Sequence, residues 1–196
     1  MKKIVLVAIF AVAGLTASAQ TEKGNVLLGG SIGLGTSKSD VDGAKSSTNF
    51  EIMPKAGYFV SNNTAVGLGL GYEYNKFSTG AKSDEFSVAP FGRAYKNLSD
   101  QFKFFGELSV PIGFGSEKNA AGDKVGESTS VGVSLAPGFA FFPTKKVAIE
   151  LAFSGISYSN IKTEDANGNK VDAASGSSFN IGANFFAPSL GVAFHF

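Results

Sequence analysis

The chain has 196 residues and a nearly balanced charge, with 17 lysines and arginines against 16 aspartates and glutamates. It contains no cysteine and no tryptophan, but it has 25 glycines and 19 phenylalanines. The charge balance lacks the basic excess that marks nucleic-acid-binding proteins, so no nucleic acid partner is expected, and the lack of cysteine excludes disulfides and a cysteine-linked lipid anchor.

Residues 1–19 have the pattern of a secretory signal peptide. Lys2 and Lys3 precede a run of 12 apolar residues, Ile4 to Leu15, which is followed by the small residues Ala17-Ser18-Ala19. The run is shorter than the roughly 20 residues of a membrane-spanning helix, whereas a basic start and a small-x-small end are typical of an export signal. We expect cleavage after Ala19, which leaves residues 20–196 as one domain.

This domain is predicted to be all-β, because small residues alternate with large apolar ones along most of it. The eight expected strands are 24–35, 49–60, 65–77, 86–96, 102–115, 128–142, 147–159 and 177–196. Tight turns at 61–64, 97–101 and 143–146 alternate with longer polar loops at 36–48, 78–85, 116–127 and 160–176. Short turns at one end and long loops at the other are typical of an up-and-down transmembrane barrel.

Each expected strand has one apolar face, such as Val66, Leu68 and Leu70 on the third strand. The charged residues on the opposite face are Glu51, Lys55, Glu73, Arg93, Glu107 and Glu150. Lys76 is the exception, and it lies at a strand end from which a long side chain reaches lipid headgroups. A water-soluble sandwich would instead turn the charges outward. We favour charges inside a barrel, because the charged face is otherwise Gly, Ala and Ser, which suit a narrow interior.

The six inward charges are expected to form a polar network in the barrel lumen. Arg93 and Glu107 flank the turn 97–101 almost symmetrically, so they should be cross-strand neighbours in contact. Lys55 and Glu73 are expected to lie diagonal to each other, and Glu150 to join Arg93. Unpaired buried charges would cost several kcal/mol each, so the network is expected to plug the lumen. The alternative is an ion path through the barrel.

Aromatic residues gather near both ends of the strands, as the interfacial girdles of membrane barrels do. Near the tight turns lie Tyr58, Phe59, Phe102, Phe104, Phe105, Phe139, Phe141, Phe142, Phe194 and Phe196. Near the loops lie Tyr72, Tyr74, Phe86, Phe114, Tyr158 and Phe179. Packing in an ordinary core is the alternative to two girdles.

Five prolines fall within expected strands, where the missing backbone donor interrupts a ladder. They are Pro54, Pro90, Pro111, Pro137 and Pro188. We expect a β-bulge at each of them. The outward-facing parity of the last strand also slips at Phe185-Phe186, which supports a bulge near Pro188.

Motifs for catalysis or cofactor binding are weak. The glycines between Gly67 and Gly71 recur every second residue within a strand and precede no helix, so they do not predict a phosphate loop. The polar stretch from Asp165 to Asp172 has oxygen ligands that suit calcium, but Asn-Gly turns are common in such loops. His195, the only histidine, is expected at the turn-side rim and not in a catalytic site. No enzyme activity, metal or cofactor is therefore expected.

The chain resembles the small outer-membrane β-barrel domain family, to which the OmpA and OmpX barrels belong. The resemblance rests on the signal segment, the hairpin Tyr58 to Gly69, the segment Ala89-Pro90-Phe91-Gly92-Arg93 and the final strand Ser189 to Phe196. It implies an eight-stranded antiparallel barrel in the outer membrane of a Gram-negative bacterium. It also implies that Leu190, Val192, Phe194 and Phe196 form the C-terminal signal for the barrel assembly machinery.

Two functions remain open on these grounds. The first is a structural or surface-interaction role, in which a monomer in the outer-membrane lipid contacts an extracellular ligand through its loops. The second is a narrow, porin-like channel or transporter for small solutes. The family implies fold and location, but not which of these roles applies, because function in such barrels lies in the loops.

Overall fold

The structure is a computed structural model and describes residues 21–38, 45–182 and 188–196. The expected signal peptide and the parity slip at Phe185-Phe186 lie outside these residues. The strands are β1 (Val26–Ser37), β2 (Ser47–Ser61), β3 (Thr64–Lys76), β4 (Lys82–Asn97), β5 (Phe102–Ser109), β6 (Ile112–Lys118), β7 (Lys124–Phe141), β8 (Val147–Ala152), β9 (Ile156–Asp165), β10 (Gly176–Ile181) and β11 (Ser189–His195). A single turn of 3-10 helix, η2 (Asp172–Ala174), precedes β10. No helix in the described part of the chain is long and apolar enough to cross a membrane.

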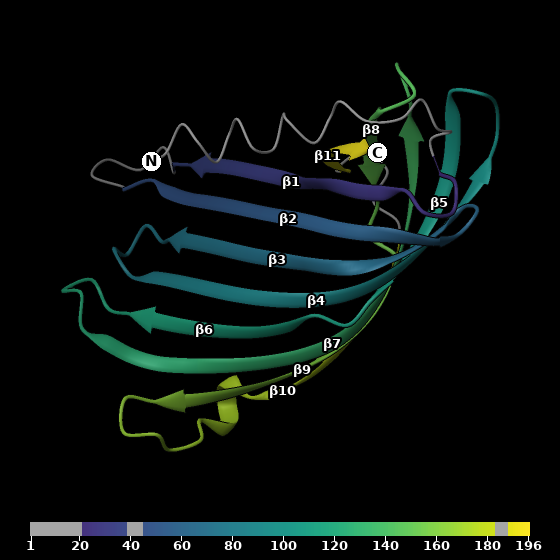
Figure 1. Ribbon diagram of the computed structural model, residues 1–196. Helices are drawn as coiled ribbons and strands as arrows, with labels where there is room; N and C mark the ends of the chain where they lie inside the picture. The colour runs from purple at the N-terminus through teal and green to yellow at the C-terminus, as the bar shows by residue number, and fades with distance from the viewer. Residues whose placement is uncertain (1–20, 39–44, 183–187) are drawn as a thin grey trace, which may run out of the picture.

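All neighbouring strands pair antiparallel, and they form the predicted eight-stranded barrel (Figure 1). Three barrel strands are divided into two elements each: β5 with β6, β8 with β9, and β10 with β11. The register across the first interruption is continuous, because β4 pairs with β5 up to Phe91↔Ser109 and with β6 from Val88↔Ile112. Because three of the strands are interrupted, the eleven elements form eight barrel strands.

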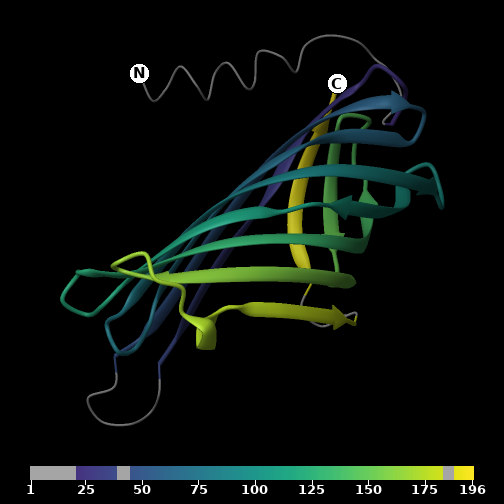
Figure 2. The same cartoon turned by 90° about the horizontal axis from the view of Figure 1, so that it is seen from below.

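The barrel closes where β11 pairs with β1 on one side and with β8 on the other. We call this the turn end, since the turns at 62–63, 98–101 and 142–146 lie there together with β11, and the opposite end is the loop end. Beyond Ser31, the described residues of β1 pair only with β2, and β10 pairs only with β9. Figure 1 accordingly shows β1 and β10 at opposite margins of a curved sheet, and Figure 2 shows the same sheet from below.

Two of the expected long loops are short turns. The strand β3 extends to Lys76 and β4 begins at Lys82, while β6 extends to Lys118 and β7 begins at Lys124. The backbone N–H groups of Phe77 and Asn119 donate to the carbonyls of Ala81 and Asp123, each at 2.9 Å, and so close both turns. The predicted loops 78–85 and 116–127 were wrong because polar strand ends have the composition of loops.

The predicted division of the strands into two faces is confirmed. Leu68, Leu108 and Val131 are 45%, 51% and 50% exposed on the outer surface. Arg93, Glu107 and Glu150 are buried on the inner one. In a membrane, lipid covers the exposed apolar side chains of such a barrel. In water, the same side chains would form a large exposed apolar surface.

The bulge prediction is correct for only part of the prolines. The ladders around Pro54, Pro90 and Pro111 keep their register, so no bulge lies there. Pro137 lies at a bulge, because residues 153–155 face residues 136–137 of β7. Pro188 precedes β11, and the residues before it, 183–187, lie outside the described residues, so the bulge expected there stays a prediction.

Candidate functional site in the barrel lumen

Four of the six predicted lumen charges meet in one cluster in the turn-side half of the barrel. Arg93 of β4 lies directly opposite Glu107 of β5, as the turn between them predicts. Glu150 of β8 and Lys55 of β2 reach the same cluster from other parts of the wall. We call Lys55, Arg93, Glu107 and Glu150 the ion layer.

Arg93 is the centre of the ion layer. Its Nε and Nη2 atoms donate to Oε2 of Glu107 at 2.9 and 2.7 Å, and its Nη1 atom donates to Oε1 of Glu150 at 2.6 Å. Lys55 donates to the other carboxylate oxygen of Glu107. These contacts confirm the predicted neighbours Arg93 and Glu107, as well as the predicted approach of Glu150. Two cations meet two anions, so the layer has no net charge.

The layer is buried, and its burial explains why it must be paired. Arg93 is 4% exposed, Glu107 7% and Glu150 9%. The guanidinium carbon of Arg93 also lies 4.3 Å from the ring centroid of Phe105, where the face of the ring attracts a cation. A buried charge that lost its partner would keep the whole cost of desolvation. The four charges therefore depend on one another.

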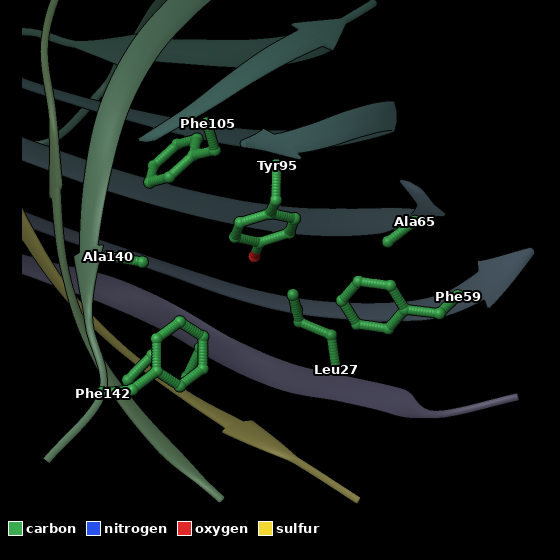
Figure 3. Packing of buried hydrophobic residues seen from close by; sticks show 9 residues of the cluster. Leu27, Phe59, Ala65, Tyr95, Phe105, Ala140 and Phe142 are labelled. Carbon is green, nitrogen blue, oxygen red and sulfur yellow. The ribbon is translucent and has the colours of Figure 1, made fainter. Parts of the chain in front are cut away.

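An aromatic layer, shown from close by in Figure 3, fills the lumen, and the strand order places it between the ion layer and the turn end. Phe59, Tyr95, Phe105 and Phe142 are buried there with Leu27. Tyr95 joins the two layers, because its hydroxyl accepts a hydrogen bond from Nη1 of Arg93 at 3.0 Å. His195 is 2% exposed and lies 5.1 Å from the ring of Phe142 and 5.6 Å from that of Phe59, between centroids.

Three residues assigned to the turn-side girdle thus belong to the lumen instead. Phe59, Phe105 and Phe142 fill the interior, and glycine makes the room for one of them: a Cβ atom on Gly138 would lie 2.3 Å from the ring of Phe105. Outward-facing aromatics such as Tyr58, Phe102 and Phe139 do face the membrane side. The prediction failed because it grouped the aromatic residues by their position along the strands and did not consider which face of the strand each one occupies.

Polar residues that the sequence did not predict close the turn end, namely Thr21, Asn63, Asn97 and Lys103. Thr21 is 4% exposed, its hydroxyl donates to Oδ1 of Asn63 at 2.6 Å, and its carbonyl accepts from the Asn63 N–H at 2.7 Å. Lys103 of β5 donates to Thr21 Oγ1 at 3.1 Å and to Asn97 Oδ1 at 2.6 Å. Lys103 shares the odd-numbered parity of Glu107, which would have identified it as a lumen residue.

The other two predicted charges lie nearer the loop end. Glu51 is opposite Glu73, which is opposite Glu85 on the next strand. Asn75 donates to Glu73 at 2.7 Å. The predicted pairing of Lys55 with Glu73 is wrong, because the register sets Lys55 opposite Gly69 and Lys55 reaches Glu107 across the lumen. Among the described residues, no group of three or more His, Cys, Asp or Glu side chains could hold a metal ion.

A cavity of about 440 Å³ opens above the ion layer. Glu51, Lys55, Arg93, Glu107 and Glu150 contribute to its wall and floor. Small residues form much of the remaining lining, among them Ser31, Ala89, Ser134 and Gly191. The lumen is therefore a cup that is open toward the loop end and closed toward the turn end.

The C-terminal strand closes the barrel through both of its edges. Leu190 and Val192 point outward and are 59% and 44% exposed. Phe196 and Val26 exchange two backbone hydrogen bonds, at 2.8 and 3.0 Å, and the rings of Phe194 and Phe196 stack with centroids 6.3 Å apart. The residues of the expected assembly signal thus lie together on the outer face of the closing seam.

Comparison with known proteins identifies this architecture. The family model described as outer membrane protein beta-barrel domain matches residues 4–185. Neisserial surface protein A has a similar fold, with 16% identity, a TM-score of 0.54, and coverage of 88% of this chain and 97% of that one.

Two further solved structures align over most of the chain. The outer membrane protein OprG from Pseudomonas aeruginosa shows 16% identity and a TM-score of 0.49 over 91% of this chain and 99% of its own. The attachment invasion locus protein Ail of Yersinia pestis shows 14% identity and a TM-score of 0.45 over 89% and 99%. No curated protein sequence matches the chain significantly. The family match spans most of the sequence, and the chain belongs to the outer membrane protein beta-barrel domain family.

Proposed function

We propose that the protein is a non-enzymatic integral outer-membrane barrel that has no through-channel and acts through its loop-end surface. The observation that carries this proposal is the pair of stacked layers in the lumen. The ion layer spans the barrel from β2 through β4 and β5 to β8, and the aromatic layer lies below it. Thr21 and Lys103 then cover the turn end.

A solute that crossed this lumen would have to displace both layers. The interior of an eight-stranded barrel is just wide enough for side chains to fill, and here large rings fill it. Opening the ion layer would also separate Arg93 from Glu107 and Glu150, all three of which are less than one tenth exposed, and this separation costs several kcal/mol. Both arguments favour a plugged barrel whose lumen charges fix register and rigidity.

The loop end is the surface that remains for contact with an extracellular partner. The largest described connection there is 166–175, and it is organised locally. The Asp165 carboxylate accepts from the N–H groups of Asn167 and Asn169 at 2.8 and 2.9 Å, and Lys170 pairs with Asp172 at 2.7 Å. This use of Asp165 competes with the calcium role considered from the sequence.

The route to the membrane belongs to the same proposal. The signal peptide 1–19 directs export and is cleaved after Ala19, and the outward-facing Leu190, Val192, Phe194 and Phe196 are read by the barrel assembly machinery. The mature protein is a monomer, since the barrel closes on itself through β1, β8 and β11. His195 lies within the aromatic layer, which favours a packing role over catalysis.

A narrow channel is the competing function, and the cavity above the ion layer is the observation in its favour. Conductance in planar bilayers separates the two. The wild-type protein should give no steady current. A variant that thins both layers, with Arg93→Ala and Glu107→Ala added to Tyr95→Ala, Phe105→Ala and Phe142→Ala, should conduct, because it removes the central ion pair and three of the buried rings. The shift in gel mobility between unheated and boiled samples checks that both proteins are folded. A steady current from folded wild-type protein would contradict the plugged barrel and favour the channel.

A further inference from the structure

Four lysines form one row across adjacent strands near the loop end. Lys76 lies opposite Lys82, Lys82 opposite Lys118, and Lys118 opposite Lys124. The strands involved are β3, β4, β6 and β7. We call these four residues the lysine row.

The lysine row belongs to the outer face of the barrel. Lys76 follows the even-numbered parity of Tyr72, and Lys82 and Lys118 follow that of Phe86 and Phe114, all of which are exposed on the outside. A register shift in the ladder between β6 and β7 brings Lys124 opposite Lys118. The four ammonium groups therefore face whatever surrounds the barrel at this height, and not the cup inside it.

Such a row is unfavourable without added negative charge. Like charges placed directly opposite each other on neighbouring strands repel, and the row contains three such pairs in succession. Lys124 pairs with Glu127, and Lys118 lies 3.9 Å from Asp84. Within the described residues, Lys76 and Lys82 have no acidic partner. The lysine row and its two acidic partners thus carry two more positive than negative charges. An external anion would neutralise this excess.

The position of the row indicates what that anion is. Tyr72, Phe86 and Phe114 form a second row in the same register, with exposed fractions of 42%, 47% and 54%. Aromatic rows of this kind mark the interface between hydrocarbon and headgroups. The lysine row lies four residues farther along the strands, or about 13 Å, and lysine side chains can reach back toward the headgroups.

We infer that the lysine row binds the phosphate groups of lipid headgroups in the leaflet at the loop end. Neighbouring strands are about 4.8 Å apart, so several ammonium groups can surround one phosphorylated headgroup. The lipid supplies the charge that the strands lack, and the row anchors the barrel at a fixed depth. This inference is independent of whether the lumen conducts.

Native mass spectrometry of the folded protein in detergent micelles provides the test. Bisphosphorylated lipid A is titrated, and the retained lipid is counted for the wild type, for Lys76→Gln with Lys82→Gln, and for the matched control Lys96→Gln with Lys145→Gln at the turn end. An exposed lysine near an anionic lipid surface contributes roughly fivefold in affinity. We expect the loop-end variant to bind about 30-fold more weakly and the control to bind as the wild type does.

Three outcomes would overturn the inference. They are equal binding by the loop-end variant and the wild type, equal weakening by the control, and displacement of lipid A by inorganic phosphate beyond that caused by chloride at the same ionic strength. The variant Lys76→Arg with Lys82→Arg keeps the charge and should retain binding. Should the glutamine variant fail to fold, dephosphorylated lipid A with the wild-type protein gives the same test, because it should not be retained.

Discussion

At the scale of single residues, Arg93 holds the lumen together. It donates to two carboxylates from different strands and to the Tyr95 hydroxyl, and it stacks on Phe105. Glu107 is its counterpart, because it accepts from both cations of the ion layer through separate oxygens. The loss of Glu107 would leave two cations, Lys55 and Arg93, with a single remaining anion, Glu150.

Replacement of Glu107 by alanine should therefore be strongly destabilising. We expect a loss of about 3–5 kcal/mol in the free energy of unfolding, because a buried ion pair is broken from one side. Glu164→Ala is the matched control, since Glu164 forms an exposed pair with Lys162 that is worth about 1 kcal/mol or less. Urea unfolding in lipid vesicles measures both, and equal effects of the two changes would contradict a coupled ion layer.

At the scale of the strands, close packing between the wall and the aromatic layer depends on glycine. A Cβ atom on Gly138 of β7 would lie 2.3 Å from the Phe105 ring and 2.7 Å from the Leu151 carbonyl oxygen. On the neighbouring β5, a Cβ atom on Gly106 would meet nothing within 4 Å. The two glycines thus have different roles.

Gly138→Ala should destabilise the barrel, while Gly106→Ala should not. Overpacking of a filled interior costs about 1–3 kcal/mol, whereas alanine at an open strand position removes some chain entropy from the unfolded state. The unfolding midpoint in detergent or lipid is the measurement. If both variants unfolded at the wild-type midpoint, the Phe105 ring would have to move freely within the lumen.

The strands also show where sequence reasoning succeeds and where it stops. The pairing of Arg93 with Glu107 could be predicted, because a tight turn fixes the register of the two strands that it joins. The partner of Lys55 could not be predicted, since Glu107 lies across the lumen and not on a neighbouring strand. The strand ends that carry the lysine row have the polar composition of loops, because their outward side chains lie beyond the hydrocarbon region of the membrane.

At the scale of the whole molecule, the sequence predicts the barrel but not its interior layers. Strand parity, the tight turns at one end and the C-terminal strand point to one closed sheet, and they do so independently of one another. The aromatic layer was missed because a phenylalanine in the lumen and one in a girdle differ only in parity. No sequence pattern predicts that Thr21 is buried, since its position depends on contacts with Asn63 and Lys103, which are distant in the sequence.

The direction of the apolar face is the property on which the whole architecture depends, and Leu68 tests it. Leu68 is the fifth of the 13 residues of β3, is 45% exposed and has Ala56 and Pro90 beside it. Leu68→Arg should lower the stability of the inserted barrel by about 2–4 kcal/mol if the site lies at the bilayer midplane. Leu98→Arg is the control, because Leu98 is 56% exposed in the turn 98–101 outside the strands. Unfolding in lipid vesicles compares the two variants. An unchanged midpoint for Leu68→Arg would mean that this face meets water, because an apolar environment makes an unpaired arginine costly.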